Sequence, residues 1–163
     1  MKLKLIQEQK LSSDVTNITF DNVFSNDYLD YVITAHDGLG TVASNNMRLL
    51  DAAGTEQSQT DYIIHQIYGT NSAENYQKST GHSGFFDTFW KYGDGVNISC
   101  FVFNPYDDNQ QTLVSGFGNA NQLFYDSAML YKTSERIRGF KLIQGSSTTY
   151  YNLGILSIYG IEY

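Results

Sequence analysis

Three histidines are the side chains of this sequence best suited to metal binding or proton transfer. They are His36, His65 and His82, and none lies in an HExxH, HxH or cysteine-containing pattern that would bring two ligands to one ion. His65 follows Ile64 in an apolar run, which is typical of a residue that packs on a strand. The sequence therefore predicts no metal site and no cofactor.

Carboxylates could form a catalytic pair, as in glycosidases, where two of them flank the scissile bond about 5 to 9.5 Å apart. The segment YDDNQQ resembles the start of a calcium loop, but it lacks the alternating Asx residues, the glycine and the closing glutamate. Six aspartates are candidates, and nearly all of them stand beside Gly, Asn or a strand end, where Asp side chains favour turns: Asp61, Asp87, Asp94, Asp107, Asp108 and Asp126. We interpret these residues as turn formers, with a glycosidase as the least favoured alternative.

No activated nucleophile is evident in the sequence. The single cysteine, Cys100, lies in the apolar run VNISCFVF, which is typical of a buried thiol that packs as a small hydrophobic residue. The serines include no GxSxG motif, since QGSST lacks the second glycine, and GFGNAN lacks the third glycine of a phosphate-binding loop. We predict that the chain is not an enzyme and has no catalytic residues.

The segment SGFFDTFWKYGDG is densely aromatic, with Phe89, Trp90 and Tyr92 close together, and Tyr106 follows the only proline in a polar loop. Exposed aromatic faces can stack on sugars, whereas buried ones fill a core. We take Phe89, Trp90, Tyr92 and Tyr106 as candidate binding residues, with core packing and contact between subunits as the alternatives.

The composition of the chain indicates which classes of partner molecule to expect. Charged residues make up 17% of the chain and aromatic residues 15%, and the formal net charge is −7. Without a cluster of Lys and Arg, nucleic acid is not expected as a partner. The start of the chain does not read as a signal peptide, and no apolar run is long enough to insert into a membrane. A charge-poor, tyrosine-rich surface instead favours docking to another molecule.

The elements expected to position these residues are short strands. Apolar or alternating runs are separated by Gly, Asn, Asp and Ser, without a sustained helical period. We predict an all-β fold in a single domain over residues 1–163: an antiparallel β-sandwich, jelly-roll-like, of about nine or ten strands. The segment from Asn46 to Tyr68 reads as a hairpin around Gly54, and the closing strand is expected to pair inside the sheet between Gly154 and Gly160.

Two strand patterns make more specific predictions. YLDYVITAH is expected to be half-buried, with one face formed by Leu29, Tyr31, Ile33 and Ala35. VNISCFVF is apolar on both faces, so the face that carries Phe101 and Phe103 should be covered by a loop, by another sheet element or by another subunit.

Three segments in order resemble a family of small β-sandwich modules found in tailed-phage virions as tail-fibre domains and as head-decoration or cement proteins. The first is ITFDNVFSNDYLDYVITAHDGLGTVASNNMRLLDAAG, and the second is VNISCFVFNPYDDNQQT with its Asn-Pro and polar loop. The third, IRGFKLIQGSSTTYYNLGILSIYGIEY, is similar to the family's closing hairpin, with Ile158 where Leu is usual.

The resemblance implies a structural protein of the virion that is made in the host cytoplasm, self-associates, as a homotrimer, and binds capsid or tail proteins. It implies no catalytic residue. The alternative from a different class is a carbohydrate-binding module that recognises a host surface glycan as part of a phage tail fibre.

Overall fold

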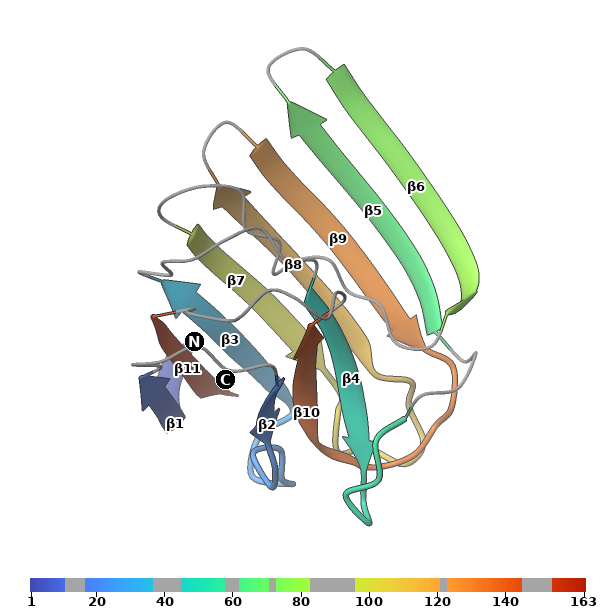
Figure 1. Ribbon diagram of the computed structural model, residues 1–163. Helices are drawn as coiled ribbons and strands as arrows, with labels where there is room; N and C mark the ends of the chain where they lie inside the picture. The colour runs from blue at the N-terminus through green and yellow to red at the C-terminus, as the bar shows by residue number, and fades with distance from the viewer. Residues whose placement is uncertain are drawn as a thin grey trace.

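The computed structural model describes residues 1–10, 17–36, 45–57, 62–70, 73–82, 96–120, 123–144 and 154–163, and within these ranges it contains strands and turns but no helix. The eleven strands are named in chain order (Figure 1). Their bounds are β1 Lys2–Lys10, β2 Asn17–Phe20, β3 Asp30–His36, β4 Asn45–Asp51, β5 Tyr62–Thr70, β6 Ala73–His82, β7 Val96–Phe103, β8 Leu113–Ala120, β9 Leu123–Tyr131, β10 Ile137–Gln144 and β11 Ile155–Glu162.

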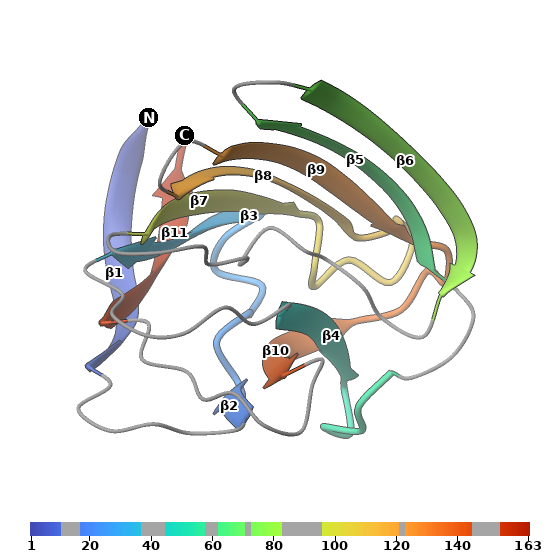
Figure 2. The ribbon, with the colours of Figure 1, turned by 45° about the horizontal axis from the view of Figure 1, so that its top comes forward.

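The strands form two layers. The larger sheet has eight strands in the order β1-β11-β3-β7-β8-β9-β5-β6, and the smaller sheet has three in the order β2-β10-β4. Each neighbouring pair is antiparallel, and the larger sheet bows over the smaller one (Figure 2). The chain crosses between the layers at β2, β4 and β10. The predicted antiparallel β-sandwich is thus confirmed, with eleven strands described where nine or ten were expected.

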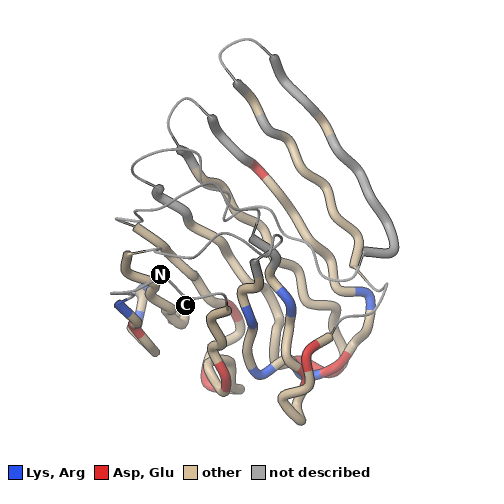
Figure 3. Tube along the Cα trace, in the orientation of Figure 1, with Lys and Arg blue, Asp and Glu red and all other residues tan. Residues whose placement is uncertain are grey.

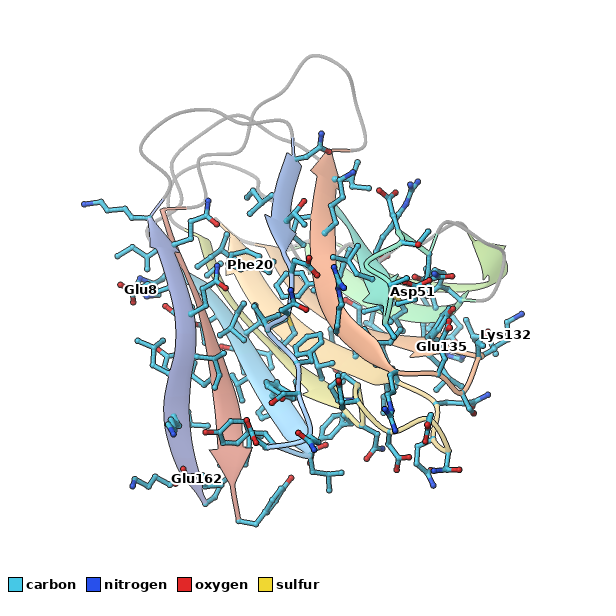
Figure 4. All side chains as sticks on the ribbon, turned by 90° about the horizontal axis from the view of Figure 1, so that it is seen from below. Glu8, Phe20, Asp51, Lys132, Glu135 and Glu162 are labelled. Atoms are coloured by element: carbon cyan, nitrogen blue, oxygen red, sulfur yellow. The ribbon has the colours of Figure 1, made fainter. Side chains whose placement is uncertain are left out.

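The core lies between the two sheets because alternate residues of each strand point inward. Phe20 of β2 and Phe140 of β10 stack with ring centroids 5.0 Å apart, and Phe20 points toward the larger sheet (Figure 4). Cys100 on β7 is fully buried, and burial raises the pKa of its thiol. The prediction that this cysteine packs as a buried hydrophobic residue is therefore confirmed.

The expected hairpin around Gly54 is wrong, although the turn itself is present. Gly54 has a φ of 84°, and one oxygen of Asp51 accepts hydrogen bonds from the backbone N–H groups of Ala53 and Thr55, at 2.9 and 2.8 Å. After this turn, however, the chain leaves the smaller sheet, and β5 pairs with β6 and β9 instead of β4. A single side chain joins the two layers here, since the Tyr62 hydroxyl accepts from the Leu49 N–H at 3.2 Å and donates to the Gln57 carbonyl at 3.0 Å.

The closing hairpin implied by the resemblance is also wrong, because β10 lies in the smaller sheet while β11 lies between β1 and β3 in the larger one. The predicted placement of β11 inside a sheet is confirmed. The strand does not end at Gly160, however, but continues to Glu162. Gly154 precedes it with a φ of 67°, and a Cβ at Gly160 would lie 2.4 Å from the Tyr28 ring. Only glycine lets the strand pass this close to the ring.

Candidate functional site

The face of the larger sheet that points away from the smaller sheet, here called the outer face, is unusually apolar. An antiparallel sheet commonly presents polar residues on its solvent side. Here the strand register places apolar side chains on this face in rows that cross the sheet. They include Leu3, Leu5, Ile63, Ile67, Phe101, Phe103, Leu113, Phe117, Leu130 and Tyr159, together with Val32 and Ile161, which their neighbours bury. The polar residues Thr34, His65, Ser115 and Asp126 stand in the same rows. An apolar surface of this extent is typical of a site where another molecule binds.

Several side chains of the outer face are well exposed. Phe117 of β8, Ile67 of β5 and Tyr76 of β6 belong to one cross-strand row that Asp126 interrupts, and they are 59%, 41% and 63% exposed. Figure 3 shows charged residues gathered mainly on the smaller sheet and at one end of the sandwich, whereas the sequences of β5, β7 and β8 contain no Lys, Arg, Asp or Glu.

Phe101 and Phe103 lie on this same outer face. Their rings stack with centroids 6.0 Å apart, and both side chains are half-buried. A described strand layer covers the opposite side of the larger sheet, not this one (Figure 2). The sequence allowed three covers for these two residues: a loop, another sheet element or another subunit. The described second layer does not shield them, because it lies on the opposite side of the larger sheet.

The β1 edge of the larger sheet is poorly suited to pairing with a further strand. Its register with β11 shifts between Leu5 and Gln7, which marks a β-bulge at Ile6. Lys2 and Lys4 precede the bulge on the same strand. Bulges and lysines both discourage the addition of further strands at an edge. The outer face, and not this edge, is the better candidate for docking.

A second feature is a cavity of about 300 Å³ at one end of the sandwich, here called the end pocket. Three segments form it: the loop before β3, the β7–β8 loop and the β9–β10 loop. Its lining residues are Asn26, Tyr28, Leu29, Asn104, Tyr106, Asp107, Asp108 and Arg136. The predicted inward position of Leu29 on β3 is wrong, because Leu29 lies before the strand and is 55% exposed, at the rim of this pocket.

Backbone contacts hold the pocket loops in place. Asn104 follows β7 with a φ of 53°, a conformation that asparagine tolerates better than most residues. Its N–H donates to the Leu29 carbonyl and to an Asp30 carboxylate oxygen, each at 3.2 Å. The Ile137 N–H donates to the Pro105 carbonyl at 2.6 Å. These bonds tie the three segments to one another, so the pocket has a defined shape.

The charges in the end pocket are partly compensated. Arg136 forms an ion pair with Asp108 at 3.2 Å, and its guanidinium carbon lies 5.6 Å from the centre of the Tyr106 ring. One oxygen of Asp107 accepts from the Asn109 N–H at 2.9 Å, which is the turn role expected for this residue. Two carboxylates against one guanidinium leave the lining with a small negative excess.

Of the four candidate binding residues, Tyr106 lies half-buried in the end pocket, and Phe89, Trp90 and Tyr92 lie outside the described residues. Sequence reasoning missed the partners of Tyr106, above all Tyr28, Asn26 and Asn104. The Asn-Pro-Tyr segment after an apolar strand was the available signal, since such a loop end often carries binding residues.

The described residues form neither a three-ligand metal group nor a membrane-spanning helix. Among those residues no group of three or more His, Cys, Asp or Glu side chains is arranged to hold a metal ion. Likewise, the described part has no helix long and apolar enough to span a membrane.

Comparisons with known proteins found no matching family model and no matching curated sequence. Among solved structures, a human SPRY domain is similar with a TM-score of 0.41 and 10% identity, covering 98% of this chain and 97% of that one. A mutant of the alginate lyase Aly36B, in complex with an alginate tetrasaccharide, is similar with a TM-score of 0.29 and 9% identity, covering 91% and 72%. At these values neither likeness bears on function.

Proposed function

We propose that this chain is a non-enzymatic structural protein of a tailed-phage virion, a capsid decoration or tail-associated protein, that self-associates and binds neighbouring virion proteins. The observation that carries the docking part of the proposal is the apolar outer face. The phage setting comes from the resemblance of the three sequence segments described above.

The size of the outer face fits a stable protein contact. Eight strands spaced about 4.8 Å apart, crossed by three rows of outward side chains, cover roughly 700 Å². A standard protein interface buries about 800 Å² on each partner. Each Å² of apolar area removed from water contributes about 25 cal/mol to binding. A partner that covers only part of the outer face would therefore already offset much of the entropy cost of association.

The curvature of the outer face restricts how copies can meet. This face is the convex side of the bowed sheet (Figure 2), and two convex surfaces touch over only a small area. A two-fold contact of outer face on outer face is therefore disfavoured. A heterologous contact, in which the outer face of one copy meets a different surface of the next, can close a ring, and the proposed homotrimer is a ring of this kind.

The test is sedimentation equilibrium of the wild-type chain beside Ile67→Lys, which places a charge at an exposed apolar position of the outer face on β5, next to the β6 edge. We expect a trimer for the wild type and at least about tenfold weaker association for the variant, since a lysine there would lose its hydration in the contact. Ser134→Lys adds the same charge in an exposed loop and is expected to associate like the wild type.

A monomeric wild type at the highest attainable concentration would contradict self-association. The virion role has a separate test, which is mass spectrometry of purified phage particles from the source of the sequence. Absence of this chain from mature particles would refute that role and leave the docking surface itself untouched.

A further inference from the structure

We propose that the end pocket binds a neutral saccharide residue, an activity distinct from protein docking by the outer face. The cavity volume, about 300 Å³, is at the lower end of the range for small-molecule sites. It lies among three loops at the end of a rigid sheet, a common place for binding residues.

The first argument is the pairing of apolar and aromatic groups at the pocket. Leu29 is 55% exposed, and Tyr28 and Tyr106 are half-buried with their rings packed against the core. Tyr28 also meets the Tyr31 ring edge-on, with centroids 5.9 Å apart. Both tyrosines line the pocket at low entropy cost, and each carries a hydroxyl. Because the Arg136 guanidinium lies over the Tyr106 ring, the exposed Leu29 supplies the most open apolar contact. A sugar ring likewise combines C–H faces with hydroxyl groups.

The second argument is the hydrogen-bonding capacity that the pocket leaves unused. Among the residues that the structure describes, the side-chain amides of Asn26 and Asn104 have no hydrogen-bond partner, although both line the cavity. An amide offers two donors and one acceptor. A hydroxyl group, which both donates and accepts, satisfies either end of such an amide, whereas a purely apolar ligand would leave both unsatisfied.

The third argument is charge, which selects a neutral ligand over an acidic one. Arg136, the one cationic residue in the lining, is already paired with Asp108, and Asp107 adds a second carboxylate. An anionic ligand such as a uronate, a sialic acid or a phosphate would meet this negative excess without a free cation to compensate it. A neutral, hydroxyl-rich ligand meets no such penalty.

The experiment is a glycan array probed with the full chain, carrying neutral glycans that end in galactose, glucose or N-acetylglucosamine beside sialylated and uronate-containing glycans. We expect binding to at least one neutral class and none to the acidic classes. Titration calorimetry with the neutral sugar so identified then compares the wild type with Asn26→Ala and Leu29→Ala, whose exposed side chains make misfolding improbable.

Each variant is expected to weaken binding about fivefold, the loss that corresponds to one hydrogen bond or one apolar contact. The control Ser134→Ala, outside the lining, should bind like the wild type, and Ile67→Lys should bind the sugar normally even where it fails to self-associate. Failure to bind any neutral glycan, preference for an acidic one, or unchanged affinity in both pocket variants would each overturn the proposal.

Discussion

At the scale of single residues, Glu56, which follows the Gly54 turn, is a carboxylate that pairs with two cations. It lies between two cations of the smaller sheet: Lys141 donates to it at 2.8 Å, and Arg48 donates to its other oxygen. Burial alone would raise the pKa of Glu56, but the hydrogen bonds from Lys141 and Arg48 outweigh it and lower that pKa below the usual 4.5. All three side chains are about one-quarter exposed, so water screens the interaction in part.

This arrangement predicts a pH-dependent effect for Glu56→Gln. Because the pKa of the folded state is depressed, the stabilisation is fully present above pH 4.5 and is lost as the pH falls through the lowered value. We expect Glu56→Gln to lower the free energy of unfolding by about 1 kcal/mol at pH 7 after screening. The difference from the wild type should shrink toward zero as the pH falls below that lowered pKa.

Urea denaturation of both proteins across this pH range measures the effect. Glu162→Gln provides the matched control, since Glu162 forms an exposed ion pair with Lys2 at 3.8 Å, and pairs of that kind contribute little. A Glu56→Gln penalty that stays the same at low pH would show that charge is not its cause.

At the scale of elements, local sequence predicted strands well and their partners poorly. Tyr31, Ile33 and Cys100 are buried as their local patterns predicted. The predicted half-burial of β3 is wrong, because Val32 on its other face is also buried. Whether β4 pairs with β5 or with β10 depends on contacts between residues far apart in the chain. A turn such as that at Gly54 reverses the chain without choosing the sheet that receives the next strand.

The candidate sites show the same difference between what local sequence predicts and what depends on contacts between distant residues. Tyr106 could be singled out because it follows Asn104 and Pro105 at the end of an apolar strand. Its pocket partners could not, because Asn26 and Arg136 reach it only through the folding of three separate loops. Similarly, the apolar second face of β7 was evident from its sequence, but its continuation across the sheet to Leu5 and Ile67 required the strand register.

The fit of β11 against the loop before β3 gives a prediction at this scale. Gly160 leaves no room for a Cβ, because one built there would lie 2.4 Å from Cγ of Tyr28. Gly160→Ala should therefore displace the ring and lower the free energy of unfolding by about 2 kcal/mol, a typical cost of overpacking. Denaturant unfolding of Gly160→Ala in the wild type and in a Tyr28→Ala background isolates this contact.

In the Tyr28→Ala background the ring is gone, so the added methyl group should cost less than about 1 kcal/mol. The same cost in both backgrounds would mean that the Tyr28 ring is not what excludes a side chain at Gly160. In that case the strand itself, and not its packing against the loop, would account for the glycine.

At the scale of the whole molecule, net charge and surface chemistry lead to opposite expectations for association. Each copy carries a formal charge of −7, so copies repel one another at long range, and salt screens that repulsion. The outer face contributes mainly apolar contacts, which do not weaken when salt is added. A contact made of ion pairs would behave in the reverse way and loosen steeply as the salt concentration rises.

The association of wild-type copies should accordingly hold or tighten slightly with salt, changing by less than about threefold between about 0.05 and about 0.5 M sodium chloride. It should also show a negative heat-capacity change, since apolar area leaves water. Sedimentation at several salt concentrations and dilution calorimetry at several temperatures measure the two quantities. Steep weakening with salt would instead place the contact on a charged surface such as the smaller sheet, whose strands carry Arg48, Arg138 and Lys141 (Figure 3).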